Sequence, residues 1–295
     1  MKKADIKTGF LCNNNCLFCV QGHKKKFGDK STTELKSILD KAAKDCEIAV
    51  FTGGEPTIRQ DIFELVRYAK KLGFKTIQIQ SNGRMFAYSD FCQKMIAAGA
   101  NEFALALHGH TAELHNYLTQ AESFQQTVSG IRNLKELNQV VITNTVITKS
   151  NYRHLPEITK LLLSLEVDQV QLAFVHAIGA AEKNFDKVVS RMSLVVPYIE
   201  KSLVIGEKMK KNVMIEGIPV CFLEKYKECI SEYVIPDTKI FDLGITIDDY
   251  KKSRLVEGKS RGLACKKCKY FNQCEGSWRE YPEKFGWDEF KAIKK

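Results

Sequence analysis

Residues 4–19 read ADIKTGFLCNNNCLFC, and residues 48–56 read IAVFTGGEP. In each stretch a short strand-like run ends in a loop, and such runs are typical of buried strands that stop at the edge of a sheet. Three thiols follow the first run, and a Gly-Gly-Glu-Pro turn follows the second. Because the carboxyl ends of parallel strands gather on one face, we expect both loops to lie on the same working face.

The alternation of strand-like and helix-like segments continues to about residue 175 and predicts a parallel sheet built from β-α units. Six strands are expected, at Asp5–Leu11, Ile48–Thr52, Thr76–Gln80, Glu102–Leu107, Val140–Ile147 and Gln169–Phe174. Helical apolar spacing predicts crossover helices over 33–44, 62–72, 91–98, 124–137 and 155–165. Six units are too few for a closed eight-stranded barrel, so the expected α/β fold is a partial (β/α)6 TIM-like barrel.

A change of rhythm near residue 210 predicts a domain boundary. Beyond it come short strand-like pieces, two prolines and a tail that contains cysteine, glycine and tryptophan. We therefore expect a barrel domain over residues 1–210 and a small α+β domain over residues 211–295.

Composition excludes several classes of protein. The 295 residues are 44% hydrophobic, enough for a well-buried core, and no apolar run approaches the roughly 20 residues that span a bilayer. The net charge is +10, but the lysines are spread along the chain and no arginine-aromatic cluster typical of single-strand nucleic-acid binding is present. We expect a cytoplasmic protein with neither a membrane nor a nucleic acid as partner.

The ten cysteines point to metal chemistry, because a reducing cytoplasm disfavours structural disulfides. Six of the ten fall in two tight groups, Cys12, Cys16 and Cys19 near one end and Cys265, Cys268 and Cys274 near the other. Cys46 and Cys92 lie on predicted helices and are expected to be ordinary buried thiols.

The first group places three thiols within eight residues, so it can wrap three corners of a cubane cluster. A 4Fe-4S cluster that only transfers electrons is bound by four thiolates. No fourth cysteine follows until Cys46, so one iron of a cluster bound here would stay open to another ligand. Zinc is the alternative, with His23 as its fourth ligand.

The spacing of Cys12, Cys16 and Cys19, with Phe18 as the aromatic residue, resembles the C-x3-C-x-aromatic-C signature of the radical S-adenosylmethionine (SAM) superfamily. The resemblance implies a catalytic 4Fe-4S cluster whose free iron binds SAM. It also implies reductive cleavage of SAM to a 5'-deoxyadenosyl radical, which abstracts hydrogen from a substrate.

Further residues match the family's SAM-binding signatures. Gly53, Gly54, Glu55 and Pro56 resemble the motif whose backbone and acid hold the SAM amino group, although Gly-Gly is also common in turns. The resemblance further implies SAM contacts for polar residues at later strand ends, and an amide within an apolar strand needs a partner. These candidates are Ser81, Asn82, His108 and Asn144.

The second group, Cys265, Cys268 and Cys274, again lacks a local fourth ligand. Cys221 is the best candidate, since a cysteine after an Ile-Pro pair resembles the twitch or SPASM extensions that hold auxiliary 4Fe-4S clusters, and Cys229 is the second choice. Too few cysteines remain for two auxiliary clusters, so the shorter twitch form with one cluster is expected. A zinc ribbon is the alternative.

The two cysteine groups together predict a two-cluster radical SAM enzyme of the oxidoreductase or maturase type. Because such extensions are frequent in peptide-modifying members, oxidative modification of a peptide or protein side chain is the leading hypothesis. The cysteine loop begins at residue 12, so a separate peptide-recognition protein would be required. The resemblance also implies a reductant such as flavodoxin or ferredoxin.

Two alternatives remain. The first is radical chemistry on a small, possibly phosphorylated metabolite or cofactor precursor, as in the cyclisation that begins molybdenum-cofactor synthesis, although the chain lacks the terminal Gly-Gly expected of that enzyme. The second is a non-enzymatic, metal-stabilised nucleic-acid-binding protein, which would give the Gly-Gly-Glu-Pro turn no role.

Overall fold

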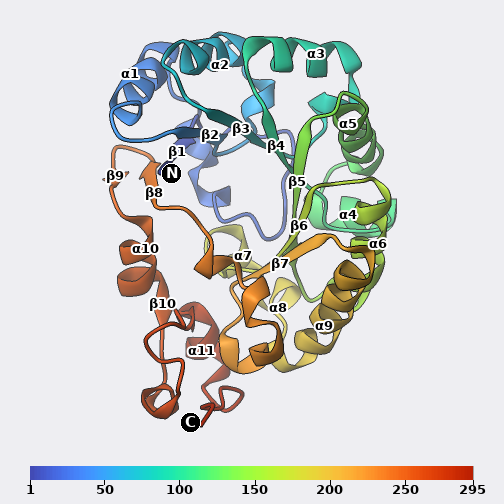
Figure 1. The fold of residues 1–295 in the computed structure, drawn as a ribbon, viewed down its shortest axis with the longest axis vertical. Coiled ribbons are helices and arrows are strands. Elements are labelled where there is room, and N and C mark those ends of the chain that lie inside the picture. The colour runs from blue at the N-terminus through green and yellow to red at the C-terminus, as the bar shows by residue number, and fades with distance from the viewer. Residues whose placement is uncertain (295) are drawn as a thin grey trace.

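A nine-stranded, mostly parallel sheet forms the body of the protein in the computed structural model, which describes residues 1–294 (Figure 1). The strand order is β7-β6-β5-β4-β3-β2-β1-β8-β9, and only the β8–β9 pair is antiparallel. The strands are β1 (Lys3–Lys7), β2 (Ile48–Thr52), β3 (Thr76–Ser81), β4 (Glu102–Ala106), β5 (Val140–Ile147), β6 (Gln169–Phe174), β7 (Asn212–Glu216), β8 (Thr238–Phe241) and β9 (Thr246–Ile247).

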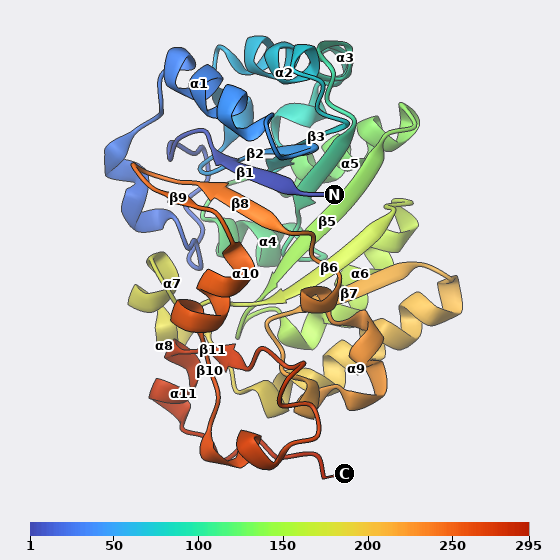
Figure 2. The ribbon, with the colours of Figure 1, turned by 60° about the vertical axis from the view of Figure 1, so that its left-hand side comes forward.

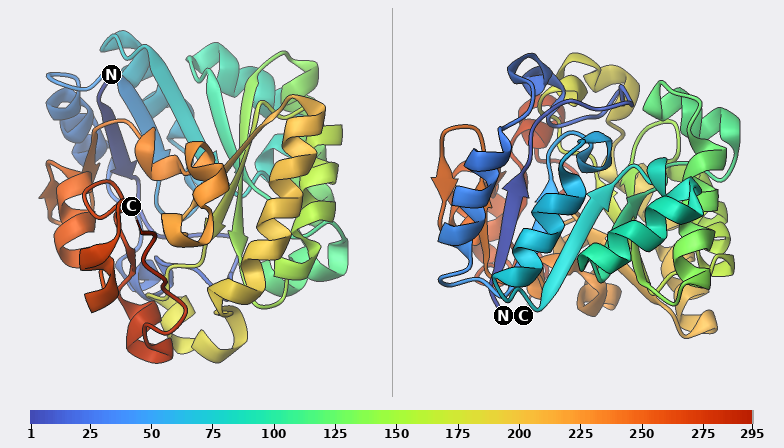
Figure 3. Two further views of the ribbon diagram at one scale, coloured as in Figure 1. Left: turned by 60° about the horizontal axis from the view of Figure 1, so that its bottom comes forward. Right: turned by 90° about the horizontal axis from the view of Figure 1, so that it is seen from above.

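Helices cover the outer face of this curved sheet, and their apolar sides meet the strands in one continuous core (Figure 3). The helices are α1 (Thr32–Ala42), α2 (Ile62–Lys71), α3 (Ser89–Ala98), α4 (Ala112–Thr119), α5 (Phe124–Glu136), α6 (Leu155–Ser164), α7 (Ala180–Lys183), α8 (Phe185–Val188), α9 (Met192–Met209), α10 (Tyr250–Ser253) and α11 (Glu280–Phe285). None of the helices within residues 1–294 is long and apolar enough to cross a membrane.

The expected α/β partial barrel is therefore confirmed, with two differences in detail. The first strand ends at Lys7 and not at Leu11, because Gly9 bridges to Asp29 and the chain then turns away. Two further parallel strands extend the barrel beyond the six expected, since β7 pairs with β6 and β8 pairs with β1. Both are short and come after the break in rhythm, which hid them in the sequence.

The C-terminal region packs against the open side of the barrel (Figure 2). Its β10 (Lys259–Ser260) and β11 (Ser277–Trp278) form a separate antiparallel pair among short 3-10 turns. Two ion pairs with almost no solvent exposure hold it in place: Arg254 binds both carboxylate oxygens of Glu275 at 2.6 Å, and Lys259 binds Glu232 at 2.5 Å. The strands β7 and β8 follow residue 210 and still belong to the main sheet. The expected domain boundary near residue 210 stays a prediction.

The carboxyl ends of β1 and β2 lie side by side, because the parallel register pairs Lys7 with Thr52. The loops that follow then meet closely. The Gly54 amide donates to the Gly9 carbonyl at 2.8 Å, and the Glu55 amide donates to the Leu11 carbonyl at 2.7 Å. A Cβ added to Gly54 would lie 2.1 Å from the Leu11 carbonyl oxygen, so only glycine fits there.

We expect Gly54→Ala to lower the free energy of unfolding by more than about 2 kcal/mol, because a backbone oxygen occupies the space of the new methyl group. Gly73→Ala is the matched control. Gly73 has a positive φ of 88° but open space around it, so its substitution carries only the backbone cost of about 1 kcal/mol. Urea denaturation of both variants measures the difference, and equal losses would contradict the packing argument.

Candidate active site

Cys12, Cys16 and Cys19 lie together in the loop that follows β1, all three as free, half-buried thiols. Burial raises the pKa of Cys16, and the neighbouring Cys19 and Cys12 raise it further. The three thiols are thus mutual neighbours that stay protonated by themselves, and a metal that binds them must displace their protons. Each thiolate of a cluster binds a different iron, so the set needs to surround a space and does not need to meet at one point.

Two cations fix the asparagine run between these cysteines. The Lys25 ammonium donates to the Asn14 carbonyl at 2.8 Å and to the Asn15 side-chain oxygen at 3.1 Å. From the other side, the Arg84 guanidinium donates to the Asn13 carbonyl at 2.6 Å and to the Asn14 side-chain oxygen at 3.1 Å. The loop is therefore held in shape by its surroundings before any cluster is present.

The Glu55 carboxylate is buried, with 3% exposure, and accepts four hydrogen bonds within the protein. It accepts from the Thr57 amide at 3.0 Å, the Thr57 hydroxyl at 2.5 Å, the Ser81 hydroxyl at 2.8 Å and the Asn82 amide at 2.7 Å. Burial raises the pKa of Glu55 against the opposing effect of these donors. Three of these donors bind Oε1 and one binds Oε2, so Glu55 joins the end of β2 to the end of β3 and Oε2 keeps one acceptor position.

Ser81 and Asn82, also expected near SAM, are engaged in the same way. The Ser81 hydroxyl bonds Glu55 and accepts from the Gly83 amide at 3.0 Å. The Asn82 side chain donates to Asn13 at 2.6 Å and accepts from the Arg84 amide at 3.1 Å. Their observed contacts hold the cysteine loop, and a direct contact with SAM stays a prediction for both, as it does for Glu55.

Phe18 and His108 form a second wall beside the cysteine loop. Their ring centroids are 4.6 Å apart in an edge-to-face arrangement. The His108 Nδ1 accepts from the Val146 amide at 3.2 Å, and burial holds the pKa of His108 well below its usual range, so the ring is neutral. Asn144, on the neighbouring strand β5, has a buried side-chain oxygen with no hydrogen-bond partner among the described residues. Of the SAM candidates, Asn144 thus retains an acceptor that a ligand can use.

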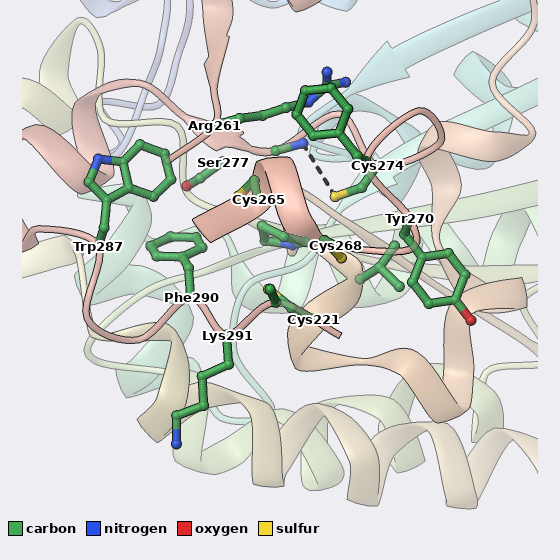
Figure 4. A pocket seen from close by; sticks show the side chains of 15 residues that line it. Cys221, Arg261, Cys265, Cys268, Tyr270, Cys274, Ser277, Trp287, Phe290 and Lys291 are labelled. Atoms are coloured by element: carbon green, nitrogen blue, oxygen red, sulfur yellow. Dashed lines mark hydrogen bonds between the residues drawn. The ribbon is translucent and has the colours of Figure 1, made fainter. Parts of the chain in front are cut away.

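The second cysteine group is assembled in one pocket, which Cys221, Cys265, Cys268 and Cys274 all line (Figure 4). Burial raises the pKa of Cys221 to about 12, with further contributions from Cys274, Cys265 and Cys268. Aromatic side chains of Phe271, Trp287 and Phe290 complete the wall. An enclosure of four free thiols and aromatic rings fits the ligand set of a closed 4Fe-4S cluster.

The remaining cysteines lie away from both groups. Cys229, the second choice for a fourth ligand, lines an outer groove beside Glu207 and Lys210 and does not line the four-thiol pocket. Cys46 and Cys92 are buried in the core, as expected.

The sequence did not predict the contacts of His176 with Trp278 and Glu280. The His176 ring, just after β6, stacks on the Trp278 ring at 3.9 Å and 9°. The His176 Nε2 lies 3.3 Å from the Glu280 carboxylate. Trp278 follows Cys274 by four residues, and the backbone of Ala180, four residues after His176, donates to the Cys19 carbonyl at 2.9 Å. His176 and Glu280 thus connect the loop after β6, which contacts the first cysteine group, to the segment that follows Cys274.

Two further histidines near the end of β4 have structural surroundings. His115 is buried, its Nδ1 accepts from the His108 amide at 3.1 Å, and its Nε2 lies 3.1 Å from the Ser123 hydroxyl. His110 stacks on His154. Neither bears on the thiol groups.

The amino-acid sequence is similar to a known protein family. A family model described as the radical SAM superfamily matches residues 6–162, more than half of the chain. A probable GTP 3',8-cyclase of Saccharolobus islandicus is 29% identical over 208 residues, which are 68% of this chain and 66% of that protein. The match thus spans just under two thirds of that relative's length. An AdoMet-dependent heme synthase of Oleidesulfovibrio alaskensis is 32% identical over 158 residues, covering 52% of this chain and 40% of that protein.

The fold is shared with solved structures as well. The crystal structure of Streptococcus suis SuiB bound to its precursor peptide SuiA matches with a TM-score of 0.72 and 16% identity, over 93% of this chain and 71% of that one. At this identity the likeness concerns the fold.

The His176–Trp278 stack gives a measurable signal. In a Trp287→Phe background, Trp278 is the remaining tryptophan, and the His176 ring covers one face of its indole at 3.9 Å. We expect His176→Gln, compared at constant pH, to shift the emission of Trp278 to longer wavelength, because that face of the indole loses its covering ring. An unchanged emission spectrum would contradict the stacked geometry.

Proposed function

Since this chain belongs to the radical SAM superfamily, whose cofactors are a 4Fe-4S cluster and SAM, we propose that it is a two-cluster enzyme that acts on a small polar molecule. Cys12, Cys16 and Cys19 hold the catalytic cluster in this proposal. Cys221, Cys265, Cys268 and Cys274 hold an auxiliary one. The convergence of these last four thiols on a single pocket carries the proposal.

The roles of the remaining residues follow from their contacts. The bound cluster supplies the electron that breaks a carbon-sulfur bond of SAM and yields the 5'-deoxyadenosyl radical. Phe18 and His108, whose rings are in contact, would flank the cofactor, and the unpartnered oxygen of Asn144 would accept a hydrogen bond from it. Glu55, Ser81 and Asn82 keep the cysteine loop aligned with the strand ends. His176, whose Nε2 lies 3.3 Å from the Glu280 carboxylate, is the proton-transfer group in our proposal.

A small substrate is supported by the inner face of the barrel. Polar side chains pair across neighbouring strands there: Thr52 donates to Asp5 at 2.7 Å, and Gln171 donates to Glu216 at 2.5 Å. A few polar groups placed in this way fix the orientation of a small polar ligand. The printed names of the relatives, a GTP cyclase and a heme synthase, point to small molecules too.

Peptide modification, the leading hypothesis from sequence, is the second candidate. It is supported by the presence of a bound peptide in SuiB, a protein of similar fold. Because that likeness stands at 16% identity, it supports the fold more than the substrate.

Iron analysis of anaerobically purified protein tests the two-cluster proposal. We expect about eight irons per chain, falling to about four in a Cys12, Cys16 and Cys19 triple alanine variant and to about four in a quadruple alanine variant of the auxiliary set. Cys46→Ala and Cys92→Ala are matched controls that should keep all the iron. Full iron content in either multiple variant would contradict the assigned ligands.

The same preparations decide between the substrates. Under dithionite we expect 5'-deoxyadenosine from the wild type and none from the triple variant. We expect GTP or another phosphorylated metabolite to increase its yield, and a mixed peptide library to leave the yield unchanged. Stimulation by peptides alone would favour the second candidate.

A further inference from the structure

Three segments that lie close to the catalytic cysteines expose large apolar side chains. The 3-10 helix η1 (Gly22–Phe27) follows the cysteine loop directly and has no buried residue. Phe27 at its end is 51% exposed, Leu11 beside Cys12 is 48% exposed, and Ile245 in the β8–β9 turn is 59% exposed. Large apolar groups exposed together are a mark of an interaction site.

Specific contacts join these segments into one surface. The Phe10 amide donates to the Gly28 carbonyl at 2.9 Å, which places Leu11 beside the end of η1. The Lys24 ammonium binds the Asp242 carboxylate at 2.6 Å, which fixes the β8–β9 turn against η1. Figure 2 shows β9 beside the loop that follows β1. The docking surface, as we define it, consists of Leu11, Lys25, Lys26, Phe27, Leu243 and Ile245.

This surface is positively charged. Asp242 is paired with Lys24, and Asp29 lies 3.7 Å from Arg59. By contrast, neither Lys25 nor Lys26 has a carboxylate within ion-pair distance in residues 1–294. A partner that carries acidic groups around an apolar contact complements it.

The surface also lies next to the place where an electron must enter. Lys25 bonds the Asn14 carbonyl between Cys12 and Cys16. It also bonds the Asn15 side-chain oxygen at 3.1 Å. A protein that docks over Lys25 and Lys26 therefore lies beside the segment that carries the catalytic thiols.

We propose that an acidic one-electron carrier protein docks on this surface and reduces the catalytic cluster. The inference rests on the proposed function, because it needs a cluster in the cysteine loop. One electron passes from the reduced flavin or iron-sulfur centre of the carrier to the cluster. The carrier is oxidised, the cluster is reduced, and no covalent bond forms or breaks in this step.

The test compares two reductants on one enzyme. Reconstituted protein is given SAM with either dithionite or a bacterial flavodoxin kept reduced by its NADPH-dependent reductase, and 5'-deoxyadenosine is measured. In a Lys26→Glu/Phe27→Ser variant we expect the flavodoxin-supported rate to fall about tenfold and the dithionite-supported rate to stay at the wild-type value. Lys25 is left intact, because it supports the cysteine loop.

A Lys208→Glu/Met209→Ser variant is the matched control. It makes the same change of charge and removes an exposed apolar side chain at the end of α9, just before the start of β7 and away from the cysteine loop. Both of its rates should equal those of the wild type. Added salt should slow the flavodoxin-supported rate of the wild type and leave the dithionite-supported rate unchanged.

Several results would overturn the inference. These are an equal loss with both reductants, an unchanged flavodoxin-supported rate in the Lys26→Glu/Phe27→Ser variant, or failure of both flavodoxin and ferredoxin to support the wild type. A change in oligomeric size of that variant would identify the surface as a self-contact instead. If dithionite yields no 5'-deoxyadenosine in the wild type, the proposed function fails first, which separates the two failures.

Discussion

The contact between the cysteine loop and the Gly-Gly-Glu-Pro turn is the constraint on which the site depends. Two backbone hydrogen bonds, from Gly54 to Gly9 and from Glu55 to Leu11, fasten the loop to the end of β2. The buried Glu55 carboxylate then collects its donors from Thr57 and from the end of β3. The carboxylate thus joins the ends of β2 and β3, and the backbone of the same turn holds the loop after β1. The loop that carries the thiols therefore cannot shift without breaking hydrogen bonds that are costly to leave unmade.

A second framework holds the C-terminal thiols. The bidentate Arg254–Glu275 pair sits beside Cys274, and Lys259 connects Glu275 to Glu232. A buried pair of this kind is costly to break, so it fixes the position of the segment that contains Cys274 more than it adds to stability. Trp278, stacked on His176, then joins this segment to the loop after β6. Both thiol sets are thus positioned by the protein itself.

The sequence was informative where chemistry is local and weaker where it depends on the fold. Spacing and motif order identified the parallel barrel and the two cysteine groups, and Cys221 does line the pocket of the second group. Short strand-like pieces were expected after residue 210, but the membership of β7 and β8 in the main sheet was missed because such short strands carry no signal of their pairing partner. The donors of Glu55 come from another strand, and His176 meets Glu280 across 104 positions, so no local pattern could reveal either. A lone histidine after a predicted strand was the only available signal.

The central claim is that one thiol set leaves an iron open to SAM and the other is closed. Electron paramagnetic resonance of the reduced protein tests it most directly. With the four auxiliary cysteines replaced by alanine, the remaining cluster signal should change shape when SAM is added. With Cys12, Cys16 and Cys19 replaced, the remaining signal should be indifferent to SAM. A SAM-sensitive signal from the auxiliary set, or none from the first set, would contradict the account.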